Sequence, residues 1–170
     1  HTFMVEELMT GPMLHDLLAD GNTLLPADQA RDIAIDIAYA LEYAHSRGVI
    51  LGDLKPRNVF LTDAADRPWP AAKLSGFGLG RLEEGRNLLH SPLLFLVPAY
   101  LAPEQILGQT LDARTDLYAL GVVLYELFTG RPPFVGSDQE VMEAHLRQAP
   151  CSPRQLNPHI SASLEHLMCK

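Results

Sequence analysis

Gly48-Val49-Ile50-Leu51-Gly52-Asp53-Leu54-Lys55-Pro56-Arg57-Asn58-Val59-Phe60-Leu61 is the stretch around which the chain is organised. An apolar run enters it and another leaves it, and between them stand a carboxylate at Asp53, an ammonium at Lys55 and a carboxamide at Asn58. Pro56 cannot continue a helix and favours an extended conformation at Lys55. We therefore predict a rigid loop that aims three polar side chains at one point. The alternative is an ordinary solvated polar loop.

A long amphipathic helix is predicted directly before this loop, over residues 26–47. Pro26 suits the first helical turn, and Gly48 provides a stop after the last one. Apolar residues recur along one face at i, i+4 spacing, which indicates a buried stripe. These residues are Ile33, Ile37, Leu41 and Ala44. His45 falls in the last turn, where we expect a helix-end side chain and no catalytic role.

A second strong helix is predicted over residues 112–130, and because it is apolar nearly all round it is expected to be buried. Its main stripe is Leu117, Leu120, Leu124 and Leu127. Another helix should begin after Ser137, because Ser137 and Glu140 form a capping box, with Val141, Ala144 and Leu146 on one face. The remaining predicted elements are strands over 2–8 and 59–61, a hairpin loop over 63–72, helices over 13–20 and 161–169, and a loop over 150–158.

Composition places the chain among globular proteins of one domain. Of its 170 residues, 47% are hydrophobic and 20% are charged, and the net charge of −8 argues against a nucleic-acid partner. Cys151 and Cys169 have no metal-ligand spacing and predict no disulfide framework, which suits the cytoplasm. The longest apolar helix candidate, 117–128, is too short to span a bilayer. Because the sequence opens on His1, we expect it to be a piece of a longer protein.

The quoted loop resembles the catalytic loop of eukaryotic-type protein kinases, which in the Ser/Thr branch usually reads His-Arg-Asp-Leu-Lys-Pro-x-Asn. Four further family landmarks follow in the family's order. They are Gly76-Phe77-Gly78, Ala102-Pro103-Glu104, the helix from Asp116 to Gly121, and Gly130-Arg131-Pro132-Pro133-Phe134. Each alone is weak, but all in order are specific, and they look most like bacterial Ser/Thr kinases. The resemblance implies a mostly α fold: the large C-terminal lobe, a helical bundle with small β-hairpins that carry the catalytic and metal loops.

The same resemblance assigns roles to individual residues. Asp53 would orient or deprotonate the substrate hydroxyl, Lys55 would offset charge on the transferred phosphoryl group, and Asn58 would hold Mg²⁺. The backbone at Glu7 and Met9 would bind the adenine of ATP, with Phe60 beneath the ring. For Phe60 simple core packing is equally compatible, and the segment around Glu7 and Met9 alone reads as an ordinary strand, turn and helix.

Two residues would support the loop. Asp116 matches the family aspartate that accepts backbone N–H groups of the catalytic loop, although it could instead be a helix N-cap. Glu104 matches the glutamate that pairs with an arginine of the last family helix, which lies beyond residue 170.

The departures from the family pattern gather in the active region. Gly76 replaces the aspartate that normally holds the metal, and Leu51 and Gly52 replace the His-Arg pair. Val97 stands where a threonine would bridge to Asp53 and Lys55, and Met13 replaces the ribose-binding acid. These five degraded positions are Met13, Leu51, Gly52, Gly76 and Val97.

Three further acidic residues stand out in the active region. A charged Glu6 stands at the position that gates the back pocket, which is unusual in the family. Glu83 and Glu84 could replace the lost carboxylate only if the segment after Gly78 folded back. The phosphate-covering small lobe is absent from the sequence, so we expect a partial kinase-like domain over 1–170.

Three functions remain open. The first is a pseudokinase that binds a protein partner or a nucleotide with little phosphoryl transfer. The second is an active Ser/Thr protein kinase, acting on a protein substrate with ATP and altered Mg²⁺ binding. The third is a purely structural fragment. The sequence leaves open the substrate, the partner and the oligomeric state.

Overall fold

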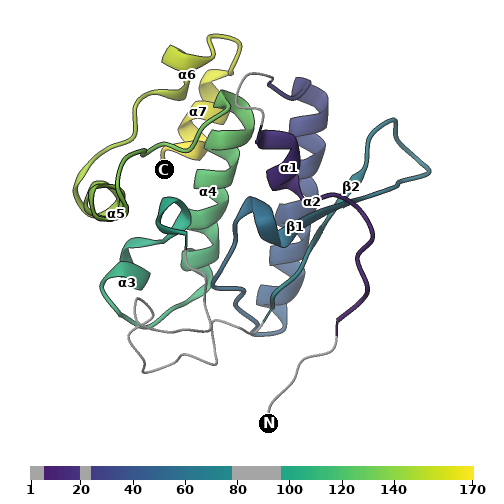
Figure 1. Ribbon diagram of the computed structural model, residues 1–170, viewed down its shortest axis with the longest axis horizontal. Helices are drawn as coiled ribbons and strands as arrows, with labels where there is room; N and C mark the ends of the chain where they lie inside the picture. Colours follow the sequence, from purple (N-terminus) through teal and green to yellow (C-terminus); the bar gives the residue numbers. More distant parts are fainter. Residues whose placement is uncertain (1–5, 20–23, 78–96) are drawn as a thin grey trace.

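The computed structural model describes residues 6–19, 24–77 and 97–170, and this part of the chain is mostly helical (Figure 1). Two long helices, α2 (Ala27–Ser46) and α4 (Ala113–Thr129), pack against each other at its centre. The shorter helices are α1 (Leu14–Leu18), α3 (Pro103–Ile106), α5 (Asp138–Arg147), α6 (Pro153–Leu156) and α7 (Ala162–Met168). The predicted mostly α architecture is confirmed. The expected strand over 2–8 falls partly outside the described residues, and no strand forms over 6–8.

Helix α2 follows the sequence pattern closely. Ile33, Ile37, Leu41 and Ala44 are all buried, together with Ala30, so the predicted stripe faces the core. The helix ends before Gly48, whose φ of 69° lies in the left-handed region that glycine adopts without strain. The buried stripe supplies much of the apolar surface that holds α2 to α4 and to the loop that follows it.

One antiparallel hairpin lies against α2. Its strands β1 (Val59–Thr62) and β2 (Ala71–Leu74) pair in the register Val59 to Leu74 and Thr62 to Ala71. The predicted hairpin connection between them is confirmed. The described residues contain this one two-stranded sheet, so the expectation of several small hairpins is met by a single one there.

Polar contacts from α2 fix the outer part of the hairpin. Asp36 accepts the backbone N–H of Ala72 at 2.8 Å and pairs with Arg67. The indole N–H of Trp69 donates to Asp32 at 2.9 Å. Helix α2 therefore holds the connection at Arg67 and Trp69 and the start of β2 at Ala72.

The segment before α1 lies along the other side of β1. Met13 forms a bridge with Phe60, and the N–H of Leu61 donates to the carbonyl of Pro12 at 2.8 Å. A Cβ added at Gly11 would lie 1.6 Å from the carbonyl oxygen of Leu61, so only glycine lets the two backbones approach this closely. This close approach brings residues 6–12 to the hairpin.

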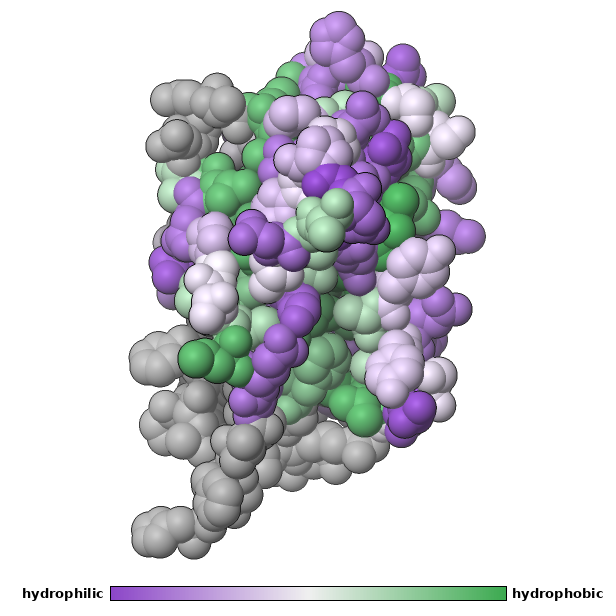
Figure 2. All heavy atoms as spheres, turned by 90° about the vertical axis from the view of Figure 1, so that its right-hand side faces the viewer, coloured by the Kyte–Doolittle hydropathy of each residue, from purple (hydrophilic) through white to green (hydrophobic). Residues whose placement is uncertain are grey.

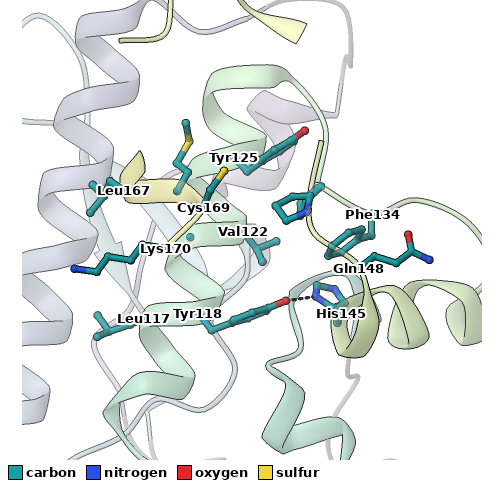
Figure 3. Close-up of a pocket in the computed structure, with 14 residues that line it drawn as sticks. Leu117, Tyr118, Val122, Tyr125, Phe134, His145, Gln148, Leu167, Cys169 and Lys170 are labelled. Carbon is teal, nitrogen blue, oxygen red and sulfur yellow. Dashed lines mark hydrogen bonds between the residues drawn. The ribbon is translucent and has the colours of Figure 1, made fainter. Parts of the chain in front are cut away.

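Helix α4 has the predicted extent but not the predicted burial. The Asp112 side chain caps its first turn by accepting the N–H of Arg114 at 2.8 Å, and Gly130, with φ of 80°, ends it. Leu117, expected in the buried stripe, is 54% exposed. The prediction was wrong there because α2, α6 and α7 cover other faces of the helix, and Leu117 lies at a cavity of about 240 Å³ (Figure 3).

Helix α5 begins with the predicted capping box, in which Ser137 N–H donates to Glu140 Oε2 at 2.8 Å. Val141 and Ala144 are buried as expected, but Leu146 is exposed and His145 is buried in its place. Apolar spacing could not identify the buried face of α5, because a histidine that satisfies both of its ring nitrogens takes the inner position.

The predicted loop over 150–158 also contains the single turn α6.

His145 joins three elements in a buried polar contact (Figure 3). Its Nδ1 lies 2.7 Å from the hydroxyl of Tyr118 on α4, and its Nε2 lies 3.1 Å from the carbonyl oxygen of Ala99. Because the carbonyl can only accept, Nε2 carries the proton and Nδ1 accepts from Tyr118. Burial lowers the pKa of His145, opposed by the carbonyls of Ala99 and Pro98. The folded chain therefore favours the neutral imidazole.

No helix in the described ranges is long and apolar enough to cross a membrane.

We expect the stability of the chain to fall on acidification through His145. Below its ordinary pKa of 6.5, the unfolded chain takes up a proton that the folded chain resists, so unfolding is favoured progressively as the pH drops. Urea unfolding at pH 7.5 and 5.5 measures the difference. In His145→Gln this difference should shrink, while His159→Gln, at an exposed histidine, should keep the wild-type difference. An unchanged difference in His145→Gln would contradict the assignment.

Candidate functional site

Asp53, Lys55 and Asn58 meet at one point, between the end of α2 and the start of β1. Lys55 Nζ lies 2.9 Å and 2.6 Å from the two carboxylate oxygens of Asp53. Asn58 Nδ2 donates to the Asp53 carbonyl at 2.8 Å and to its Oδ2 at 3.1 Å. The side chains of Lys55 and Asp53 are only 8% and 9% exposed, which excludes a solvated polar loop. The short 3₁₀ turn Pro56–Asn58 brings Asn58 back toward Asp53.

The carboxylate of Asp53 has a different electrostatic environment from that of an aspartate on the surface. Burial raises its pKa, and the hydrogen bonds from Lys55 and Asn58 together with the charge of Lys55 oppose that rise. Burial therefore makes the Asp53 carboxylate more basic than it would be if only Lys55 and Asn58 acted on its pKa. A carboxylate of this kind can accept or orient the proton of a nearby hydroxyl group.

Asp116 holds the entrance of this loop from the first turn of α4. It is 1% exposed, and its two oxygens accept the N–H groups of Leu51 at 2.9 Å and Gly52 at 2.7 Å. His45 Nε2 lies 2.7 Å from Asp116 Oδ2. The N-cap of α4 is Asp112, so the N-cap interpretation of Asp116 is wrong. His45 is a helix-end residue, as expected, but its contact with Asp116 was missed.

Gly52 is held from its carbonyl side as well. Gln105 Nε2 donates to the Gly52 carbonyl at 2.7 Å, and Gln105 Oε1 accepts the N–H of Ala102 at 3.0 Å. Gly52 has φ of 72°, in the left-handed region, which gives a backbone reason for glycine where the family has arginine. Gln105 was missed by the sequence reasoning, because a buried glutamine in a one-turn helix has no motif.

The Gly76 loop lies beside Asn58. Ser75 N–H donates to the Asn58 carbonyl at 3.0 Å, which extends the hairpin ladder by one step. Gly76 itself has φ of 81° and contributes no side chain. Its N–H donates to Glu6 Oε1 at 3.0 Å, a contact that sequence reasoning did not foresee. The neighbouring Glu7 pairs with Lys73 at 2.7 Å.

The predicted adenine contacts are only partly brought together. Glu7 and Met9 line a groove of about 570 Å³ with residues of α2 and β2, and Phe60 is not among its described lining residues. Phe60 instead lies on β1, paired with Met13.

Figure 2 looks onto the right-hand side of Figure 1, where hydrophobic and hydrophilic residues are mixed over the described surface.

The other singled-out positions have local partners. Glu104 Oε1 accepts the hydroxyl of Thr115 at 2.7 Å. Met13 N–H donates to Asp16 at 2.9 Å at the start of α1. Leu51 is fully buried in the core, and Val97 directly precedes the 3₁₀ turn Pro98–Tyr100. The segment that includes Glu83 and Glu84 lies outside the described residues.

The oxygen donors decide whether a magnesium ion fits. Mg²⁺ is usually held by one or two carboxylates together with phosphate oxygens. Both oxygens of Asp53 are already bonded to Lys55, so the predicted set leaves only the neutral amide oxygen of Asn58. The described residues hold no cluster of three or more His, Cys, Asp or Glu side chains. Within the described residues, the set therefore lacks the carboxylate ligands that this ion usually takes.

Comparison with known proteins agrees with this geometry. The family model for the protein kinase domain matches residues 1–170. A probable serine/threonine-protein kinase of Streptomyces coelicolor is 37% identical over 99% of this chain and 24% of its own length. The serine/threonine-protein kinase PknB of Mycobacterium leprae is 35% identical over 99% of this chain and 26% of its own length. Pkn1 of Myxococcus xanthus is 35% identical, over 99% and 24%.

The chain belongs to the protein kinase family. It is similar to bacterial serine/threonine kinases, and it spans about a quarter of the length of the curated relatives it matches. The resemblance drawn from the loop and its ordered landmarks is confirmed at the level of the family.

Removing the Asp116 carboxylate should destabilise the fold strongly. Asp116→Ala leaves the N–H groups of Leu51 and Gly52 without their charged acceptor, at a cost of about 3–5 kcal/mol. Asp112→Ala, on the same helix four residues earlier, removes only a cap and should cost about 1 kcal/mol. Urea unfolding of both variants measures the two costs, and equal losses would show that the Asp116 contacts are not special.

Adding a side chain at Gly52 should also be costly. Gly52→Ala forces a Cβ into the left-handed region and should lower the free energy of unfolding by about 1–2 kcal/mol. Gly121→Ala is the matched control, because its Cβ would meet nothing closer than the Met168 carbonyl oxygen at 3.6 Å. Within α4 that change should be neutral or stabilising by up to about 1 kcal/mol. Thermal unfolding compares the two, and a harmless Gly52→Ala would refute the backbone argument.

Proposed function

We propose that residues 1–170 are the hinge and large lobe of a Ser/Thr-type protein kinase domain with little or no phosphoryl transfer. In this proposal the domain acts in the cytoplasm by binding a nucleotide or a protein partner. The observation that carries it is Gly76, which stands beside Asn58 in the position of the family's metal-binding aspartate and offers no carboxylate.

The substrate side of the site supports a kinase origin. Asp53 is buried, and its burial raises the pKa of its carboxylate. Lys55 and Asn58 hold the carboxylate by hydrogen bonds, as positioning of a substrate hydroxyl requires. When bound, Mg²⁺-ATP supplies the phosphoryl group and the positive charge that stabilises its transfer. Metal ions contribute several kcal/mol to such steps, and each ~1.4 kcal/mol is tenfold in rate. Loss of the main carboxylate should therefore slow transfer by orders of magnitude.

The second candidate is an active Ser/Thr protein kinase with altered metal binding. The observation in its favour is the contact geometry of Asp53, Lys55 and Asn58, which is fully formed in the described structure. Gly52 carries no side chain to pair with a phosphorylated activation segment, so in either case control by such phosphorylation is not expected.

A paired assay on the full-length protein separates these functions. We expect Mg²⁺-ATP to raise the thermal unfolding temperature, while transfer of radiolabelled phosphate to a generic protein substrate stays near background. Asp53→Asn is the control for the chemistry. Strong transfer that Asp53→Asn abolishes would replace the first function by the second. The absence of any nucleotide shift, with or without metal, would favour a partner-binding role alone.

Restoring the carboxylate tests the cause of the weak transfer. In Gly76→Asp we expect phosphate transfer to increase at least about tenfold, if a stabilisation of ~1.4 kcal/mol is regained. The φ of 81° at this position is tolerated better by aspartate than by most residues, so the variant should fold. Initial rates at saturating Mg²⁺-ATP provide the measurement. No gain in a folded variant would place the defect elsewhere.

A further inference from the structure

The outer face of α2 carries an exposed strip of large side chains. Ile35, Tyr39 and Tyr43 are 43%, 67% and 62% exposed. They recur at i, i+4 spacing, so they are neighbours along the helix surface. The buried stripe of α2 lies on the opposite side, where the helix packs against α4 and the hairpin. Single exposed residues of this size are normal, but three adjacent ones form a patch that favours contact with another protein surface.

Arg47 ends this strip with a positive charge. Its Cζ atom lies 4.7 Å from the centre of the Tyr43 ring. Among the described residues, no carboxylate forms an ion pair with Arg47. Stacking on a ring leaves the edges of a guanidinium free to donate to a carboxylate. Tyrosine and arginine are also the residue types that are enriched where protein interfaces gain most of their binding energy.

The beginning of the same face carries a negative charge. Asp28 and Asp32 both pair with Arg31, so this group has one carboxylate more than it has guanidinium groups. Asp28 and Arg31 are exposed. The exposed Glu42 lies at the margin of the face, about 60° from Tyr39 around the helix axis, where it can stay in water. The outer face of α2 therefore has an acidic beginning, an aromatic middle and a basic end.

We propose that this face of α2 is a homodimer interface, against which the same face of a second copy packs in the antiparallel direction. A self-complementary face gives a closed dimer with two-fold symmetry. If the axis passes beside Tyr39, Tyr43 lies opposite Ile35 of the partner subunit, because the two positions are equally far from the centre.

The charges favour this direction and this partner. In the antiparallel arrangement Arg47 lies beside the acidic group at the start of the partner subunit's α2, and opposite charges across an interface favour binding and fix its register. A parallel arrangement would place like charges together. The inference goes beyond the proposed function and does not depend on nucleotide binding.

Disulfide trapping on the full-length protein tests the interface. In Tyr39→Cys the two cysteines would face each other across the axis, and a disulfide requires Cα atoms within about 7 Å. We therefore expect covalent dimers under mild oxidation. Ala38→Cys, at an exposed position about 100° away around the helix, should trap no more than the wild type, whose Cys151 and Cys169 are also exposed. Equal trapping in both variants, or none in Tyr39→Cys, would overturn the inference.

Charge exchange tests the antiparallel direction. By sedimentation equilibrium of the full-length protein, we expect Arg47→Asp to weaken the dimer at least about tenfold, because it places negative charges together. Adding Asp28→Arg should restore the affinity, because it makes the facing group positive. Arg131→Asp, the same substitution at an exposed residue after α4, should dimerise like the wild type. A monomeric wild type, an unchanged dimer in Arg47→Asp, or no recovery in the double variant would each contradict the proposal.

Discussion

The site depends on one buried carboxylate. Asp116, in the first turn of α4, accepts the N–H groups of Leu51 and Gly52 and contacts His45 at the end of α2. A buried carboxylate is costly unless hydrogen bonds satisfy it, and here the backbone of the loop provides them. The same contacts that satisfy Asp116 therefore fix where the loop begins relative to both long helices, and hence where Asp53 points.

The two halves of the site differ in how complete they are. On the substrate side, Asp53 has its own buried counter-ion in Lys55 and is held by Asn58. At the Gly76 loop there is no side chain, and the carboxylate that contacts the Gly76 backbone comes from Glu6. The proposal of a domain with weak phosphoryl transfer rests on this contrast.

Much of the fold could be predicted from local patterns. The stripe of α2, the capping box at Ser137 and the Gly130 stop of α4 each reflect interactions within a few residues, so the sequence displays them directly. Burial failed at Leu117 and Leu146, because which face of a helix is covered depends on neighbours distant in the chain. The burial of His145 and the contact of Gln105 were not predicted, for the same reason. Their partners Tyr118, Ala99 and Gly52 lie far away along the chain.

The sequence by itself determined the family, the order of its landmarks and the identity of the polar residues in the loop, because these are carried by residue types at fixed spacing. Only the tertiary structure decided that Asp116 supports the loop rather than capping α4, and that Glu6 contacts Gly76. Both contacts join residues more than sixty positions apart. Such pairs form only when helices and hairpin pack together, and no local spacing rule encodes them.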